Sequence, residues 1–242
     1  MKLYGETDIG RMRKNNQDSF ITGQISDNVV WAAVCDGMGG AVGGDVASST
    51  ACNMISQMLP EMYKDSMNDS AIKNMLVSLV LAANAKIYEL SIADRSLSGM
   101  GTTIVLCLIV NNTAHIVHAG DSRAYYIKEN ECIRITKDHS VVQEMIDNGK
   151  IDEQQAATHP NRNLITRALG VDQSLLVDYC QQEIEKDTII MLCTDGLTNY
   201  LDKKDIVKFI LGDSIEQAVK NMIACANERG GSDNITIVLL EN

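Results

Sequence analysis

The sequence predicts an α+β fold in which a β-sheet core packs between helices. Apolar runs of strand length recur along the chain, and turn residues bound most of them. Two longer stretches instead carry apolar residues at the three- and four-residue spacing of amphipathic helices. The segments follow one another as strands, two helices, strands, two helices and one strand, an order typical of a sheet core covered by helices.

The N-terminal segments are expected to form three strands and then two helices. Residues 1–24 predict a strand, a polar and basic turn, and a second strand. Residues 29–35 carry no charge and have the length of a buried strand, which a glycine-rich turn over 36–44 follows. Helices are predicted over 45–58 and 70–93, and their apolar stripes favour packing on the core over binding of a partner.

Two hairpins are predicted in the middle of the chain. The near-continuous apolar run 102–110 is joined to a strand over 114–119 by Asn111-Asn112, a good hairpin signal. A second hairpin is expected between 124–128 and 132–135. A short helix over 140–148 should follow it.

Residues 149–172 differ from the segments around them. They are polar, carry Pro160 and lack a clear period, so they predict a loop or flap that carries substrate contacts. Because no internal repeat or linker is evident, residues 1–242 are expected to form one domain with this flap inserted. The remaining elements are expected as strands at 174–182 and 187–194, helices at 202–211 and 214–229, and a last strand at 234–240.

Composition excludes several classes of function. The net charge of −11 argues against a surface that binds nucleic acid or an anionic membrane. The longest aliphatic run, 104–110, is far shorter than the ~20 residues that span a bilayer. The first residues lack a basic segment followed by an apolar one, so no signal peptide is expected.

The seven cysteines predict reduced thiols. They form no C-x-x-C pair, and Cys35, Cys107 and Cys193 lie inside apolar runs. This pattern favours buried thiols in a cytosolic protein over a disulfide framework or a zinc site. Cys35 and Cys193 each precede an aspartate, and burial beside a carboxylate should raise the pKa of a thiol, so neither is expected to act as a nucleophile.

Aspartates next to turn residues follow the predicted strands. Asp36-Gly37 and Asp195-Gly196 each end an apolar run, where a carboxylate is costly unless a cation meets it. Gly120-Asp121, Ser232-Asp233-Asn234 and Asp18 extend the set. Any single pair of this kind is more often an ordinary turn. For the whole set we favour a site for hard cations such as Mg²⁺ or Mn²⁺, which prefer all-oxygen ligands.

Such a site would hydrolyse phosphate esters. Two ions ~3.5–4 Å apart, bridged by a shared aspartate, lower the pKa of a bridging water and create hydroxide near neutral pH. The same positive charge holds a phosphate ester, and a nearby arginine can clamp its oxygens in a bidentate manner.

Six short motifs, in order, resemble those of the metal-dependent protein Ser/Thr phosphatases, the type 2C or PPM family, and in particular its compact bacterial members. The motifs span the chain from about residue 5 to 240. They are Arg13-Lys14-Asn15-Asn16-Gln17-Asp18, Cys35-Asp36-Gly37-Met38-Gly39-Gly40, Gly99-Met100-Gly101-Thr102-Thr103, Gly120-Asp121-Ser122-Arg123, Thr194-Asp195-Gly196-Leu197 and Ser232-Asp233-Asn234-Ile235-Thr236. The segment from His159 to Gly170 is similar to the one that closes the flap in those bacterial enzymes.

The resemblance implies a four-layer αββα sandwich, a central β-sandwich flanked by helix pairs, and a role for each matched residue. Asp36 would bridge two Mn²⁺ or Mg²⁺ ions and the Gly37 carbonyl would bind the second. Asp195 and Asp233 would complete the first site, and Asp18 would support the second. The remaining implied roles are a third site at Asp121 with Asp195, and phosphate binding by Arg13.

The implied function is hydrolysis of phosphoserine and phosphothreonine in proteins by attack of the metal-bridging water. The resemblance also implies phosphoprotein substrates, a cytoplasmic location and a eukaryotic-type Ser/Thr protein kinase as counterpart. We expect a monomer. The family usually has glutamate where this chain has Gln17, and histidine and glutamate where it has Ala41 and Asp45. The first departure removes a negative charge near the second ion, and Ala41 removes a possible proton donor.

Two alternatives to a protein phosphatase remain open from the sequence. Gln17 and Ala41 would suit a pseudophosphatase that binds phosphoproteins without turning them over. A metal-dependent nuclease or other phosphohydrolase is disfavoured by the negative net charge. Among the histidines, His139 is expected to have a helix-start or packing role, and His115 and His118 are expected to be structural or exposed. His159 and Arg162 lie in the flap, where contact with substrate is plausible.

Overall fold

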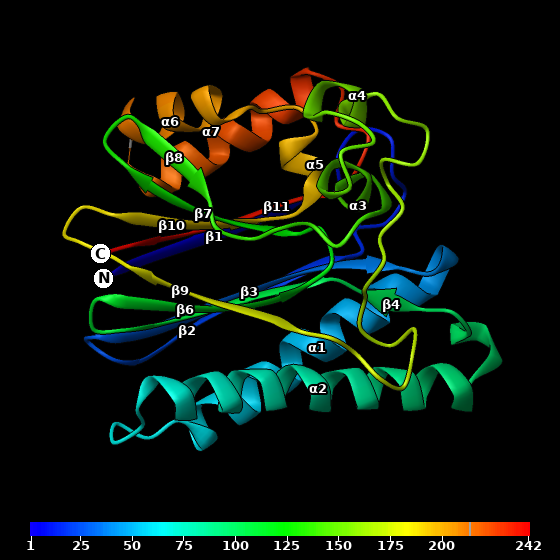
Figure 1. Cartoon of the computed structure of the whole chain (residues 1–242), viewed down its shortest axis with the longest axis horizontal. Coiled ribbons are helices and arrows are strands. Elements are labelled where there is room, and N and C mark those ends of the chain that lie inside the picture. Colours follow the sequence, from blue (N-terminus) through cyan, green and yellow to red (C-terminus); the bar gives the residue numbers. More distant parts are fainter. Residues whose placement is uncertain (213) are drawn as a thin grey trace.

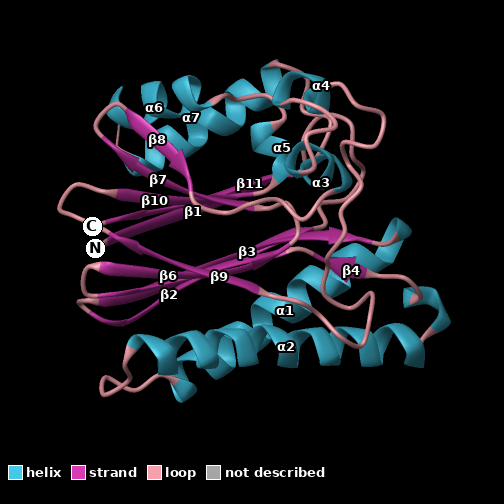
Figure 2. Ribbon diagram, in the orientation of Figure 1, coloured by secondary structure: helices cyan, strands magenta, loops and turns pink. Residues whose placement is uncertain are grey.

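Two antiparallel sheets lie face to face, and a pair of long helices covers the outer face of each (Figures 1 and 2). The structure is a computed structural model that describes residues 1–212 and 214–242; the side chains of residues 40–42 lie outside the described part. The predicted αββα sandwich is confirmed.

One sheet carries the first hairpin of the chain. Its order is β2 (Asp18–Ser26), β3 (Val29–Met38), β5 (Ile104–Val110), β6 (Thr113–Ala119) and β9 (Asp178–Glu183), and the short β4 (Gly101–Thr102) pairs with the end of β3. The other sheet joins both ends of the chain. Its order is β1 (Lys2–Asp8), β11 (Ile235–Glu241), β10 (Ile189–Cys193), β7 (Arg123–Lys128) and β8 (Glu131–Arg134).

The helices form the outer layers. The first sheet is covered by α1 (Gly40–Met62) and α2 (Asp69–Ala93), and the second by α6 (Lys203–Gly212) and α7 (Ile215–Glu228) (Figure 1). Shorter helical segments lie in the connections: η1 (Arg95–Leu97), α3 (Val141–Asp147), α4 (Glu153–Ala157) and α5 (Asp195–Thr198).

Three hydrophobic clusters fill the spaces between the four layers. Strand β3 shows why its sequence is free of charge: Val30, Ala32 and Val34 pack between the sheets, while Trp31 and Ala33 pack toward α1 and α2. A strand buried on both faces shows no alternation of polar and apolar residues. The third cluster joins α6 and α7 to β7, β10 and β11.

Two elements extend beyond their predicted limits. Strand β3 runs on through Asp36 to Met38, because β4 pairs with Gly37 and Met38. Helix α1 begins at Gly40 rather than near Asp45. Gly39 makes the turn between the two with φ at 122°, and a Cβ there would lie 2.5 Å from the Cα of Met100, so glycine is required.

The apolar helix α2 is a core helix of this fold. It is long and apolar enough to cross a membrane by length and composition alone. One face, including Ile72, Leu76, Leu79 and Ile87, is buried in the cluster that joins the helices to the first sheet. Buried core helices pass the same test of length and composition, so the helix is weak evidence for a span.

Candidate active site

Asp18 and Asp36 sit opposite each other on neighbouring strands, at one end of the sandwich. They are Cα partners in the β2–β3 ladder. The backbone of Asp36 is fixed by the Gly-Thr-Thr segment: Thr103 Oγ1 accepts from its N–H at 2.9 Å, and its carbonyl accepts from Thr102 Oγ1 at 2.9 Å and from the N–H of Thr103 at 2.8 Å. Because Ser122 Oγ lies 2.7 Å from Thr103 Oγ1, the Gly120–Arg123 segment is tied to the same point.

Asp18 also joins the two sheets. Its Oδ2 accepts hydrogen bonds from Thr194 Oγ1 at 2.9 Å and from Thr236 Oγ1 at 2.7 Å. Thr194 immediately precedes Asp195, and Thr236 lies in β11 just after Asp233. Asp18 Oδ1 is buried and has no hydrogen-bond partner within the described part of the chain.

Asp195 and Asp233 approach the same place from the second sheet. Asn199 donates a hydrogen bond to Asp195 Oδ2 at 3.2 Å. Asp195 Oδ1 is buried and has no hydrogen-bond partner among the described residues. Arg13 Nη2 donates to Asp233 Oδ2 at 2.7 Å. Asn234 holds the turn that carries Arg13, because its Nδ2 donates to the carbonyls of Ile9 at 2.9 Å and Asn15 at 3.0 Å.

Gly37 occupies a position that no other residue can take. A Cβ there would lie 2.1 Å from the carbonyl oxygen of Gly44 and 2.5 Å from that of Gln17. The N–H of Gly37 donates to the Gln17 carbonyl at 3.1 Å, and the N–H of Gln17 donates to Asn234 Oδ1 at 2.8 Å. The strand end that carries Asp36 and Gly37 is thereby joined to the Asp233-Asn234 segment.

The carboxylates raise one another's pKa. Burial, followed by the charge of Asp18, raises the pKa of Asp36 well above its ordinary value. Burial likewise raises the pKa of Asp18 to about 7, and burial together with the charge of Asp195 raises that of Asp121 to about 7. The pKa of Asp195 is also raised, by burial and by the charge of Asp233. The predicted aspartates therefore form one electrostatically linked group.

The donor set fits hard divalent cations. All of its ligand atoms are oxygens. Two buried carboxylate oxygens, Asp18 Oδ1 and Asp195 Oδ1, have no hydrogen-bond partner among the described residues, and the charges of the aspartates act on one another. Mg²⁺ and Mn²⁺ prefer such ligands. Arg13 pairs with Asp233 of this group, and the charge of Arg123 acts on Asp121 and Asp195.

The predicted flap, residues 149–172, is attached to β4, to the start of α3 and to α2. Thr102 of β4 exchanges both backbone hydrogen bonds with Leu169, and the N–H of Val141 donates to the Leu164 carbonyl at 2.9 Å. Asn84 of α2 accepts from the N–H of Gly170 at 2.8 Å and donates to the carbonyl of Asp172 at 3.1 Å. His159 and Arg162 lie in this segment. Within the described residues, their side chains make no hydrogen bond to the site aspartates.

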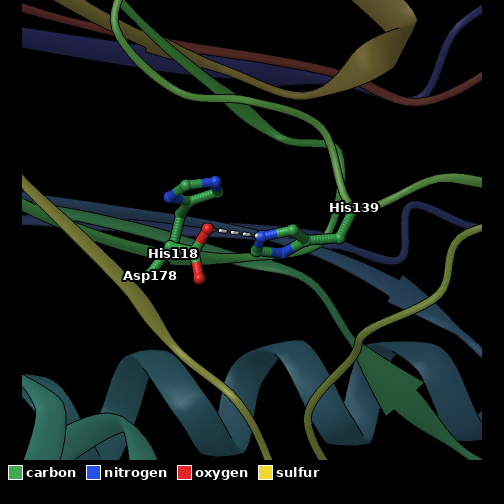
Figure 3. A group of neighbouring side chains, drawn as sticks. All are labelled: His118, His139 and Asp178. Atoms are coloured by element: carbon green, nitrogen blue, oxygen red, sulfur yellow. Dashed lines mark hydrogen bonds and ion pairs between the residues drawn. The ribbon is translucent and has the colours of Figure 1, made fainter. Parts of the chain in front are cut away.

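A second polar cluster is formed by His118 of β6, Asp178 of β9 and His139, which lies just before α3 (Figure 3). His118, His139 and Asp178 bring their ligand-type atoms within 4.8 Å of one another, as a metal site would require. Gly120 N–H donates to His139 Nδ1 at 3.1 Å, and His139 Nε2 lies 3.1 Å from both Asp178 Oδ2 and Arg167 Nη1. Arg167 donates to Asp178 Oδ1 at 2.8 Å. Because the Arg167 guanidinium already pairs with the Asp178 carboxylate, we interpret the cluster as a structural link between residue 167 and the sheet. His139 is buried and stacks on His118, in agreement with the predicted packing role.

The sequence did not single out the hydroxyl and amide groups that orient the aspartates. Thr103, Thr194 and Thr236 lie inside the motifs, yet each looks like an ordinary strand residue there. What identifies them is their contact with Asp36 or Asp18 in the folded chain, and that contact can be predicted only when the strand pairing is known. Gln17 takes part through its backbone as described above, and the side chain of Ala41 lies outside the described residues.

Comparison with known proteins gives one consistent result. The family model for protein phosphatase 2C matches residues 10–239. A putative protein phosphatase 2C-type of Streptococcus pyogenes is 35% identical, over 100% of this chain and 98% of the relative. The Ser/Thr phosphatase of S. agalactiae superposes with a TM-score of 0.93 at 32% identity, covering 99% and 98% of the two chains. The catalytic domain of PstP, solved with two manganese ions, gives a TM-score of 0.85 at 29% identity, covering 98% and 96%.

Proposed function

Because this chain belongs to the protein phosphatase 2C family, we propose that it hydrolyses phosphoserine and phosphothreonine esters in proteins. The observation that carries the proposal is the group of five aspartates from both sheets, which has two unpartnered buried oxygens among the described residues and an ion pair from Arg13 to Asp233. A phosphate dianion and the cations that neutralise it need such a constellation.

The proposed ligands follow from the positions described above. The charges of all four other aspartates act on Asp36, so Asp36 would be the ligand shared by two cations, and the Gly37 carbonyl would bind one of them. Asp195 and Asp233 would complete one cation site, Asp18 would support the other, and Asp121 with Asp195 would form a third. When bound, Mn²⁺ or Mg²⁺ would lower the pKa of a water molecule toward neutrality and offset the charge of the phosphate.

The side chains of this chain would perform three tasks. The unpartnered oxygens of Asp18 and Asp195 would accept the cations, and the raised pKa values mean that these carboxylates must release protons as they do so. Arg13 would bind the phosphate oxygens through its planar set of donors, leaving Asp233 as it does so. The flap would close over the substrate from the side of Thr102 and Leu169.

The cellular setting belongs to the same proposal. We expect phosphoproteins as substrates, a eukaryotic-type Ser/Thr protein kinase as the counterpart, a cytoplasmic location and a monomer. The free, buried thiols of Cys35, Cys107 and Cys193 support a reducing compartment.

Hydrolysis of a phosphothreonine peptide with Mn²⁺ tests the function. We expect turnover that EDTA abolishes and that Asp36→Asn lowers by at least about 100-fold, because the shared ligand loses its charge. Asp27→Asn, which changes an exposed carboxylate in the β2–β3 turn, is the matched control and should retain wild-type turnover. Unchanged activity of Asp36→Asn would overturn the proposal. Peptide binding without turnover at any Mn²⁺ concentration would instead indicate a pseudophosphatase.

A further inference from the structure

We propose that the turn Arg11–Lys14 selects phosphoproteins that carry an anionic group next to the phosphorylated residue. The inference rests on the proposed phosphatase function and adds a substrate class to it. The shared chemistry is a negative charge one or two residues from the phosphate ester, supplied by aspartate or glutamate or by a second phosphate.

The turn is fixed beside the site. The N–H of Arg11 donates to the Gly231 carbonyl at 2.7 Å, two residues before Asp233. Asn16 Nδ2 donates to Thr7 Oγ1 at 2.9 Å, and Asn234 holds both ends of the turn as described above. The turn therefore presents its side chains from a defined position at the rim of the site, where Arg13 already reaches Asp233.

The side chains on either side of Arg13 are uncompensated cations. Arg11 and Lys14 are exposed, and among the residues that the structure describes neither forms an ion pair. Other exposed cations, such as Lys204 and Lys208, also form no ion pair within the described residues; what distinguishes Arg11 and Lys14 is their position on either side of Arg13. Other basic side chains form ion pairs, for example Arg123 with Asp138 and Arg229 with Asp205.

The position of these charges gives them a role in recognition. Arg13 would hold the phosphate ester, and Arg11 and Lys14 are exposed on the same turn, so their charges would act on the residues that flank that ester. The site carboxylates would repel an acidic peptide, but under the proposed function their charge is offset by cations. Exposed charges at the rim of an interface act on selectivity and association more than on the chemical step.

Paired phosphothreonine peptides test the inference. Three peptides share one sequence and carry alanines, glutamates or a second phosphothreonine beside the scored residue. The wild-type enzyme should prefer both anionic peptides over the alanine peptide in kcat/KM. Arg11→Gln combined with Lys14→Gln should reduce that preference about three- to tenfold through KM, because two exposed charge contacts are lost. Higher ionic strength should weaken the preference of the wild type.

Matched variants separate this effect from general charge or folding. Lys204→Gln with Lys208→Gln removes two exposed cations from α6, far from the site (Figure 1), and should leave the preference unchanged. The single variant Lys14→Glu changes a side chain that has no ion pair in the described structure. It should partly reverse the preference for the anionic peptides over the alanine peptide, while the Tm stays at the wild-type value. A preference for only the doubly phosphorylated peptide would identify phosphate as the recognised anion.

Equal kcat/KM for all three peptides, or a preference that survives both turn variants, would overturn the inference while leaving the phosphatase proposal intact. Absence of hydrolysis of every peptide by the Mn²⁺-loaded wild type would overturn both.

Discussion

Asp18 shows how a buried carboxylate is prepared for a ligand. Two threonine hydroxyls donate to Oδ2, and they lower a pKa that burial otherwise raises. Because both hydroxyls bind the same oxygen, Oδ1 is left as an acceptor without a donor among the described groups. The hydroxyls thus fix the direction of the free oxygen, and the cation proposed to bind there would complete its contacts.

Removal of one hydroxyl should weaken cation binding. Thr236→Val keeps the shape of the side chain but takes one donor from Asp18, so Oδ1 loses its fixed direction and the carboxylate holds its proton more tightly. We expect the Kd for Mn²⁺, measured by calorimetry, to rise about 10- to 100-fold. Thr113→Val, at the start of β6 and outside the site, should leave the Kd unchanged. Equal affinity in both variants would show that the hydroxyl does not orient the ligand.

The raised pKa of Asp121 should appear in the pH dependence of stability. Burial raises its pKa to about 7 in the folded state, whereas an unfolded chain has it near ~3.9. The folded state then binds a proton that the unfolded state lacks, so this group's contribution to stability falls as pH rises from ~4 through about 7. In EDTA, Asp121→Asn should lose less stability than the wild type between pH 6 and pH 8. Parallel Tm profiles for the two proteins would contradict this.

At the scale of elements, Asn84 is the point where α2 holds the flap. It lies on the buried face of α2, which is apolar apart from Asn84 and Ser91, and it satisfies the N–H of Gly170 and the carbonyls of Asp172 and Gln173. A polar side chain in such a position is retained because each of its groups is paired. The tether leaves the outer part of the flap, including α4, free of this constraint.

Loss of this tether should loosen the flap. Asn84→Ala leaves three backbone groups without their partner, and we expect the free energy of unfolding to fall by about 1–3 kcal/mol. Limited proteolysis should cut the variant within residues 170–176 sooner than the wild type. Asn74→Ala, on the exposed face of the same helix, is the control and should show neither change.

The sequence was sufficient for most elements but not for their ends. The hairpin at Asn111-Asn112 and helix α2 lie where the pattern of apolar residues predicts them, because that pattern records which faces are buried. The predicted end of β3, at residue 35, was three residues too early, because Gly37 and Met38 pair with β4, a segment far along the chain. The four-residue α5 was missed because it is too short to show a helical period.

At the scale of the molecule, the site lies where two sheets meet. Asp18 and Asp36 belong to the first sheet, and Asp195 and Asp233 flank strands of the second. The sequence predicted each aspartate through its neighbouring glycine or turn residue. Which of them meet is decided by the pairing of β1 with β11 and by the packing between the sheets, and no local pattern carries that information.

Cations bound at this junction should stabilise both sheets together. Repulsion among the buried carboxylates opposes the packing of one sheet end on the other, and divalent cations would convert that repulsion into shared contacts. We therefore expect Mn²⁺ to raise the Tm and to slow amide hydrogen exchange at β3 and β11 alike. Asp36→Asn should lose the slowing in both strands, because its carboxylate is the one shared between the proposed sites. Protection confined to β3 would place the cations on one sheet only and contradict a junction site.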